Sequence, residues 1–129
     1  MSRVVAVNQT GGPDVLSIED WSVGEPGPGQ VKLRQTAIGL NFIDTYQRSG
    51  LYPLPLPFVA GNEAAGVVTA VGEGVTEVGV GDRVCYQGTP GAYADERLVP
   101  AAKLVPIPDD IDDQTAAAVL LKGLTAFYL

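Results

Sequence analysis

The chain has 129 residues, enough for one domain with its own hydrophobic core, and 46% of them are hydrophobic. Its 15 Asp and Glu outnumber its 8 Lys and Arg, which gives a formal net charge of −7. This charge repels polyanions, so nucleic acid and anionic membrane surfaces are poor partners. The chain has no His and a single Cys, Cys85, which excludes a His/Cys zinc site and every mechanism that uses His as a base.

Short β-branched runs separated by Gly and Pro turns occupy most of the chain, a pattern typical of an antiparallel sheet or barrel. Cys85 lies in one of these runs and is expected to be buried rather than nucleophilic. No apolar run is long enough to cross a membrane, and we expect a cytoplasmic protein. The expected strands cover residues 3–8, 15–21, 31–38, 65–71, 82–87, 92–99 and about 103–105.

The first expected helix covers residues 42–49. Asn41, with an acid three residues later, has the form of an N-cap, and Gly50 follows as a C-terminal stop. The segment 52–57 that comes next alternates with Pro and must be extended.

The second expected helix begins at Asp112 or Asp113, since the acidic cluster of residues 109–113 favours a solvated helix start over a cation site. Its apolar pattern runs to Leu129 with no closing Gly, Pro or polar cap. We therefore expect the chain to be a fragment of a longer protein, and we expect residues 120–129 to mediate self-association of this fragment.

Two glycine-containing motifs lie in the middle of the chain, Gly-Asn-Glu-Ala-Ala-Gly at residues 61–66 and Gly-Asp-Arg-Val at residues 81–84. They resemble the Gly-His-Glu-x-x-Gly and Gly-Asp-x-Val motifs of the medium-chain dehydrogenase/reductase superfamily. Asn62 stands where zinc-dependent members have a ligand His, and Asn41 replaces a ligand Cys. The lobe that holds a structural zinc in the family is missing, because only residues 88–91 separate two strands there.

Residues 41–52 and 121–126 extend this resemblance to the zinc-free quinone oxidoreductase, or zeta-crystallin-like, branch. It implies that residues 1–129 form a mainly β GroES-like catalytic domain, a partly open β-barrel, and that a Rossmann domain binding NADPH follows residue 129. The chain itself has no Gly-x-Gly-x-x-Gly fingerprint. We therefore expect the 129-residue chain to be inactive by itself. We expect the full-length parent protein to be a homodimer.

The implied reaction is hydride transfer from NADPH to a quinone or conjugated enone. Such substrates are already electrophilic, so positioning and hydrogen-bond donors suffice, whereas alcohol oxidation requires a Lewis acid. The alternative is a stand-alone GroES-like binding or assembly module, or a crystallin-type structural protein, with no catalysis.

The resemblance implies that Asn41, Tyr46 and Tyr52 are catalytic and that Asn41, Tyr46, Lys122 and Thr125 contact the cofactor. Each residue also has a structural interpretation. Asn41 could be a helix cap alone, Tyr46 a core residue, and Tyr52 a packing partner of the prolines. Lys122 could face solvent, and Thr125 could bond back within its own helix.

Two further charged residues have less defined expected roles. Glu63, the acid of the Gly-x-Glu motif, is expected to form a structural ion pair, with an Arg as the candidate partner, rather than to transfer protons. Arg48 is a candidate for this pair or for a phosphate contact.

Overall fold

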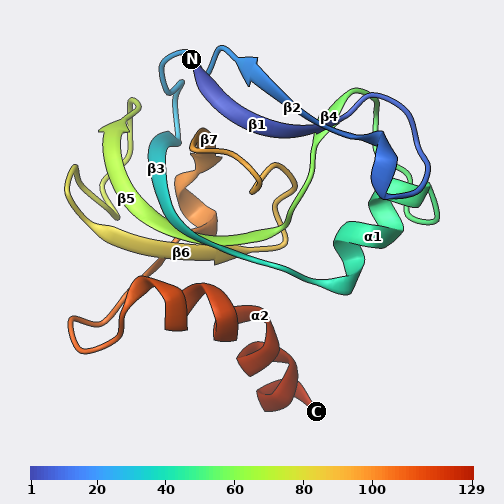
Figure 1. Cartoon of the computed structure of the whole chain (residues 1–129). Helices are drawn as coiled ribbons and strands as arrows, with labels where there is room; N and C mark the ends of the chain where they lie inside the picture. The colour runs from blue at the N-terminus through green and yellow to red at the C-terminus, as the bar shows by residue number, and fades with distance from the viewer.

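The computed structural model describes all 129 residues as two antiparallel sheets and two α-helices (Figure 1). One sheet has the order β2-β1-β4 and the other the order β7-β3-β5-β6-β8. Along the chain the elements are β1 (Ser2–Val7), η1 (Pro13–Val15), β2 (Leu16–Trp21), β3 (Gln30–Gly39), α1 (Phe42–Ser49), β4 (Phe58–Val59), β5 (Glu63–Val71), β6 (Arg83–Gln87), β7 (Glu96–Pro100), η2 (Ala101–Lys103), β8 (Val105–Pro106) and α2 (Asp113–Tyr128).

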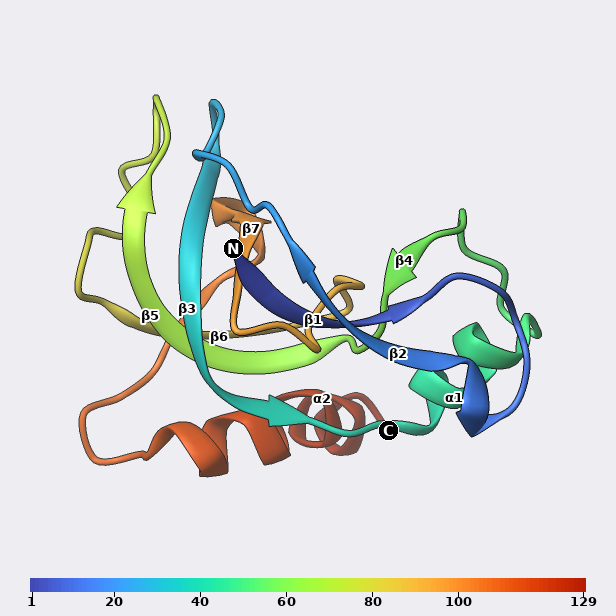
Figure 2. The same cartoon turned by 45° about the horizontal axis from the view of Figure 1, so that its top comes forward.

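The five-stranded sheet buries apolar side chains on both faces, because successive residues of a strand point to opposite sides. On β5, Ala64 joins the main core, whereas Ala65 packs against the residues beneath α2. On β6, Val84 likewise joins the main core, and Cys85 packs against the residues beneath α2. Figure 2 shows α2 lying across the outer face of this sheet, and the core on the inner face comprises Val31, Leu33, Ala64, Val68, Val78, Val84, Tyr86, Ala92, Val99 and Ala101.

The two sheets do not close into a continuous barrel. An isolated bridge between Val4 of β1 and Ala94 links the three-stranded sheet to the segment before β7. Strands β3 and β5 pair over most of their length and curve together around the core (Figure 2). This architecture confirms the predicted fold class, a mainly β, partly open barrel with short helices.

Both helices begin where the sequence predicts. Helix α1 has Asn41 as its N-cap and ends at Gly50, whose φ of 88° is in the left-handed region that a Cβ disfavours. Helix α2 has Asp112 as its N-cap, and the Asp112 carboxylate accepts a hydrogen bond of 2.7 Å from the Thr115 N–H. The acidic cluster therefore contains a helix cap, as expected.

The predicted strands differ from the observed ones in three places. The two-residue strand β4 was not predicted, because it is too short to show an alternating pattern. Residues 92–95 are not in a strand, since the Gln35 side chain donates to the carbonyls of Ala92 and Ala94 at 2.7 and 2.6 Å. The expected strand at 103–105 is instead the end of η2 followed by β8.

The last turns of α2 expose large apolar side chains, with Phe127 and Tyr128 93% and 88% exposed. The predicted self-association through residues 120–129 stays a prediction. Neither helix is long and apolar enough to cross a membrane.

Candidate functional site

A polar cluster forms where the end of β3, the start of β5 and helix α2 meet. The Glu63 side chain is fully buried, and its Oε2 accepts a hydrogen bond of 2.8 Å from Asn41 Nδ2. Lys122 Nζ donates to Asn41 Oδ1 at 3.1 Å and lies 3.9 Å from Glu63 Oε2. The Lys122 side chain is 59% exposed, so the cluster runs from a buried carboxylate to an ammonium at the surface.

Helix α2 contributes a backbone donor to this cluster. The Leu121 N–H donates to Glu63 Oε1 at 2.9 Å, although Leu121 lies well inside the helix. Figure 1 shows that α2 changes direction along its length. The helix approaches closely because residue 39 is Gly, where a Cβ would lie 2.6 Å from the Ala117 carbonyl oxygen and 3.0 Å from Glu63 Oε2.

A second, buried network anchors α1 to the start of β5. Asn62 Nδ2 donates to Asp44 Oδ1 and to Gln47 Oε1, both at 2.8 Å. Tyr93 donates its hydroxyl to Asp44 Oδ2 at 2.6 Å, and the Asn41 N–H donates to the same oxygen at 3.1 Å. Burial and the Asp44 carboxylate both raise the pKa of Tyr93 above its usual range. Asn41 therefore joins the two networks.

Tyr46 and Tyr52 form a separate aromatic pair. Their ring centroids lie 5.3 Å apart with the planes at 63°, an edge-to-face contact. Tyr46 is 37% exposed and Tyr52 is 51% exposed, and neither hydroxyl makes a hydrogen bond within the chain. These exposures do not fit the interpretation of Tyr46 as a core residue.

The structure brings only some of the predicted site residues together. Asn41 and Lys122 are in contact, and Tyr46 and Tyr52 are in contact, with no hydrogen bond joining the two pairs. Thr125 Oγ1 donates to the Leu121 carbonyl at 2.9 Å. This is the bond within its own helix that was the structural interpretation of Thr125.

The structure corrects the expected partner of Glu63. The cation beside Glu63 is Lys122, and not an Arg. Arg48 Nε donates to the Gly11 carbonyl at 3.2 Å, which links α1 to the turn after β1, and a phosphate contact of Arg48 stays a prediction. Cys85 is buried, as expected, and burial raises the pKa of its thiol, with the Glu63 charge adding to the rise.

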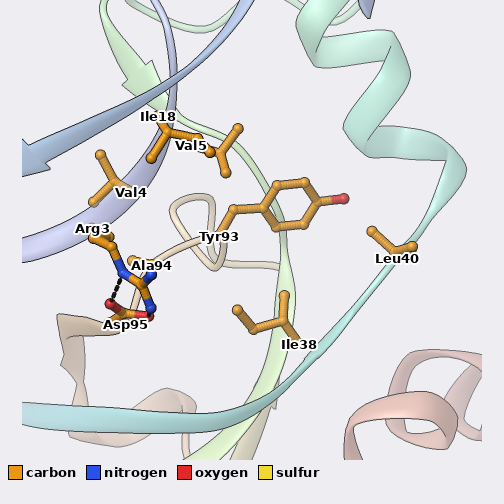
Figure 3. A pocket seen from close by; sticks show the side chains of 9 residues that line it. All are labelled: Arg3, Val4, Val5, Ile18, Ile38, Leu40, Tyr93, Ala94 and Asp95. Atoms are coloured by element: carbon orange, nitrogen blue, oxygen red, sulfur yellow. Dashed lines mark hydrogen bonds and ion pairs between the residues drawn. The ribbon is translucent and has the colours of Figure 1, made fainter.

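A cavity of about 400 Å³ is separate from the polar cluster. It lies between β1, β2 and the end of β3, and Figure 3 shows the Tyr93 ring among apolar side chains with the Arg3–Asp95 ion pair at its edge. Leu40 lines this cavity, and its neighbour Asn41 belongs to the cluster. A groove of about 320 Å³ between β3 and α2 includes Lys122 and is the one that borders the cluster.

Sequence reasoning missed the buried network as part of the site. The sequence predicts an acid in the first helical turn at Asp44, a replaced zinc ligand at Asn62 and a strand residue at Tyr93. The spacing of Asp44 and Gln47, one turn apart on the same face of α1, was the available signal, and these two are the buried residues of the helix.

The donor set at these positions does not suit zinc. Asn41 and Asn62 occupy the two ligand positions that the family motifs indicate, and their amide nitrogens are hydrogen-bonded to Glu63 and Asp44. Amide side chains are not among the ligands that zinc prefers. No three His, Cys, Asp or Glu side chains are grouped so as to hold a metal ion.

Comparison with known proteins places this chain in a family. Residues 27–109 match the model of the alcohol dehydrogenase GroES-like domain, and the chain belongs to that family. A quinone oxidoreductase from Pseudomonas aeruginosa is 53% identical over 131 residues, covering 100% of this chain and 40% of the relative. A 2-haloacrylate reductase from a Burkholderia species is 52% identical over 137 residues, covering 100% and 41%.

Solved structures agree with these matches. The Escherichia coli quinone oxidoreductase complexed with NADPH has a TM-score of 0.94 at 44% identity, with 99% of this chain and 40% of that chain covered. The predicted resemblance to the quinone oxidoreductase branch of the medium-chain dehydrogenases is thereby confirmed. The chain spans about 40% of the length of these relatives.

Proposed function

We propose that the complete gene product reduces a quinone or a conjugated enone with NADPH, and that residues 1–129 form its GroES-like catalytic domain. The relatives named quinone oxidoreductase and 2-haloacrylate reductase support this reaction class. Because the chain spans only 40% of such a relative and carries no Gly-x-Gly-x-x-Gly, we propose that a Rossmann domain after residue 129 binds the dinucleotide phosphates.

The observation that carries this proposal is the contact between Lys122 and Asn41, which brings a cation and an amide to the surface above buried Glu63. NADPH, when bound, supplies hydride. The substrate accepts that hydride as two electrons and one hydrogen, its carbonyl oxygen becomes negative, and a proton from solvent completes the reduction. Lys122 and the unpartnered hydroxyls of Tyr46 and Tyr52 are donors suited to this developing oxyanion.

The residues present also suit the nicotinamide half of the cofactor. The Asn41 amide and the Lys122 ammonium provide a donor and acceptor set for ribose hydroxyls and a carboxamide, and the Thr125 hydroxyl oxygen can still accept. We propose Asn41, Tyr46, Lys122 and Thr125 as cofactor contacts and Asn41, Tyr46 and Tyr52 as catalytic residues.

The proposed chemistry needs no zinc, because hydride addition to a quinone or enone leaves an oxyanion that hydrogen-bond donors can stabilise. We further propose that the gene product is a cytoplasmic homodimer acting on small molecules.

Steady-state assays of the complete gene product test this function. With p-benzoquinone, loss of NADPH absorbance should be rapid, and with ethanol and NADP⁺ the reverse change should be absent. Dialysis against a chelator should leave the quinone rate unchanged. A purified, folded gene product that oxidises NADPH with neither quinones nor enones would favour the alternative of a binding or structural module.

A further inference from the structure

The orientation of the Asn41 amide depends on the two charges beside it. Its Nδ2 faces the Glu63 carboxylate and its Oδ1 faces the Lys122 ammonium. Rotating the amide by half a turn would place an oxygen against the carboxylate and an N–H against the ammonium, so both contacts would become repulsive. The charged pair therefore selects one of the two amide orientations.

Glu63 is well placed to set this orientation because its backbone is fixed on both sides. It pairs with Gly39 of β3 and with Gln87 of β6, in the interior of the five-stranded sheet. Its side chain is fully buried, and each carboxylate oxygen has a hydrogen-bond donor within 2.9 Å. A side chain locked in this way is a rigid support for its neighbours.

The selected orientation leaves bonding capacity free on Asn41. Nδ2 carries two hydrogens and donates one to Glu63, and Oδ1 accepts one bond although it has two lone pairs. One N–H and one lone pair therefore remain for a ligand, together with the exposed ammonium of Lys122.

The same carboxylate also fixes the element that carries Lys122. Leu121, whose N–H binds Glu63 Oε1, directly precedes Lys122 in α2. Gly39 permits this approach, as a Cβ there would contact both Ala117 and Glu63. Glu63 thus controls the position of Lys122 through the backbone as well as through charge.

We propose that Glu63 is a positioning residue, which orients the Asn41 amide and places Lys122 for the reacting substrate and cofactor without touching either. This inference rests on the proposed function for its kinetic consequence, but the geometry it requires can be measured without any reaction. Both kinds of measurement are needed to separate the two claims.

The first test uses nuclear magnetic resonance on the 129-residue chain. In the wild type, the Leu121 amide should be protected from hydrogen exchange, and one Asn41 side-chain amide proton should be shifted downfield by the carboxylate. Glu63→Gln should move both signals, because it replaces a charged acceptor with a neutral amide. Unshifted Asn41 signals in this variant would overturn the proposal. If the variant does not fold, an unprotected Leu121 amide in the wild type would overturn it.

The second test measures turnover of the complete gene product. Glu63→Gln should lower kcat about 10–100-fold, the scale expected when catalytic groups are misplaced by about 1 Å. The KM for the quinone should change much less, because the lost interaction acts in the transition state. Adding Glu63→Gln to Asn41→Ala should cost less than the sum of the two single losses, since part of the effect of Glu63 acts through Asn41 and the rest through Lys122.

Ser2→Ala is the matched control, because the Ser2 side chain is also buried and hydrogen-bonded, 2.9 Å from the Glu96 carbonyl oxygen. It should lower the melting temperature and leave kcat unchanged. A Glu63→Gln enzyme with wild-type kcat, or losses that add fully with Asn41→Ala, would overturn the positioning role while the proposed function stands. If the wild-type gene product reduces no quinone, the function fails and the resonance measurements alone decide the role of Glu63.

Discussion

Tyr46 is the residue whose two interpretations the structure separates most clearly. Its ring makes an edge-to-face contact with Tyr52, it is 37% exposed, and its hydroxyl has no hydrogen-bond partner in the chain. Tyr46→Phe should therefore leave the melting temperature of the complete gene product nearly unchanged. If the hydroxyl donates to the substrate oxyanion, kcat/KM should fall by about 10²–10³-fold in the quinone assay.

Tyr86→Phe provides the control for this substitution. The Tyr86 side chain is fully buried in the core, and its hydroxyl donates to Gln35. Removing that hydroxyl should lower stability by about 1 kcal/mol and leave the quinone rate as it was. A Tyr46→Phe enzyme with an unchanged rate would remove Tyr46 from the catalytic set.

Asn62 tests whether the buried network stabilises the fold. Asn62→Leu leaves Asp44 and Gln47 without their shared donor inside the protein, and an unsatisfied buried polar group costs about 1–3 kcal/mol. We expect the free energy of unfolding of the 129-residue chain, measured with urea, to fall by about 2–3 kcal/mol. Asn8→Ala, at an exposed asparagine, should change it by less than about 0.5 kcal/mol. Similar losses for both variants would contradict the role given to the network.

Residues of the candidate site were predicted from the sequence only where a motif carried them. Asn41 and Lys122 came from the family resemblance, and the structure brings them into contact. The bond from the Leu121 N–H to Glu63 joins residues 58 positions apart and uses a backbone atom, so no residue pattern could reveal it. Tertiary contacts of this kind are decided by how the sheet curves and where α2 crosses it.

At the scale of elements, one carboxylate near the start of helix α2 joins the helix to two strands of the sheet, in addition to the bond between the Leu121 N–H and Glu63. Asp113 accepts hydrogen bonds from Thr36 of β3 at 2.6 Å and from Arg83 of β6 at 2.8 Å. The Thr36 hydroxyl, together with Arg83, lowers the pKa of Asp113 below its usual value. A carboxyl group with a lowered pKa stabilises the fold above its unfolded-state pKa, and this contribution is lost as the pH falls through its folded-state pKa.

Asp113→Asn should therefore reduce stability by about 1 kcal/mol at neutral pH, and the difference from wild type should shrink below about pH 4. Urea unfolding of both chains across this pH range provides the measurement. Asp110→Asn is the control, because Asp110 is exposed and forms no ion pair. A difference between wild type and Asp113→Asn that persists undiminished at low pH would show that charge is not the cause.

The helices were predicted with correct starts, whereas several strands were not. Caps such as Asn41, Gly50 and Asp112 are local signals, readable over a few residues. Strand β4 forms because Phe58 and Val59 pair with β1, and residues 92–95 lie outside the strand, where the Gln35 side chain binds the carbonyls of Ala92 and Ala94. Both outcomes depend on segments far away in the sequence.

At the scale of the whole molecule, calorimetry tests the proposal that a Rossmann domain after residue 129 binds the dinucleotide phosphates. We propose that the chain contacts the nicotinamide half of NADPH, and its sequence has no Gly-x-Gly-x-x-Gly fingerprint for the phosphates. We expect the 129-residue chain to bind NADPH weakly or not at all and the complete gene product to bind it tightly. Micromolar affinity of the short chain would show that it contains a phosphate site of its own.

The central claim is that the complete gene product adds hydride to a conjugated acceptor and does not oxidise alcohols. Its most direct test follows deuterium from NADPH, labelled at the transferable position of the nicotinamide ring, into an enone product analysed by mass spectrometry and magnetic resonance. We predict one deuterium on the β-carbon of a saturated ketone, with label transfer slowed in Tyr46→Phe and Glu63→Gln. Deuterium on the carbonyl carbon of an allylic alcohol, or no label in any product, would contradict the account.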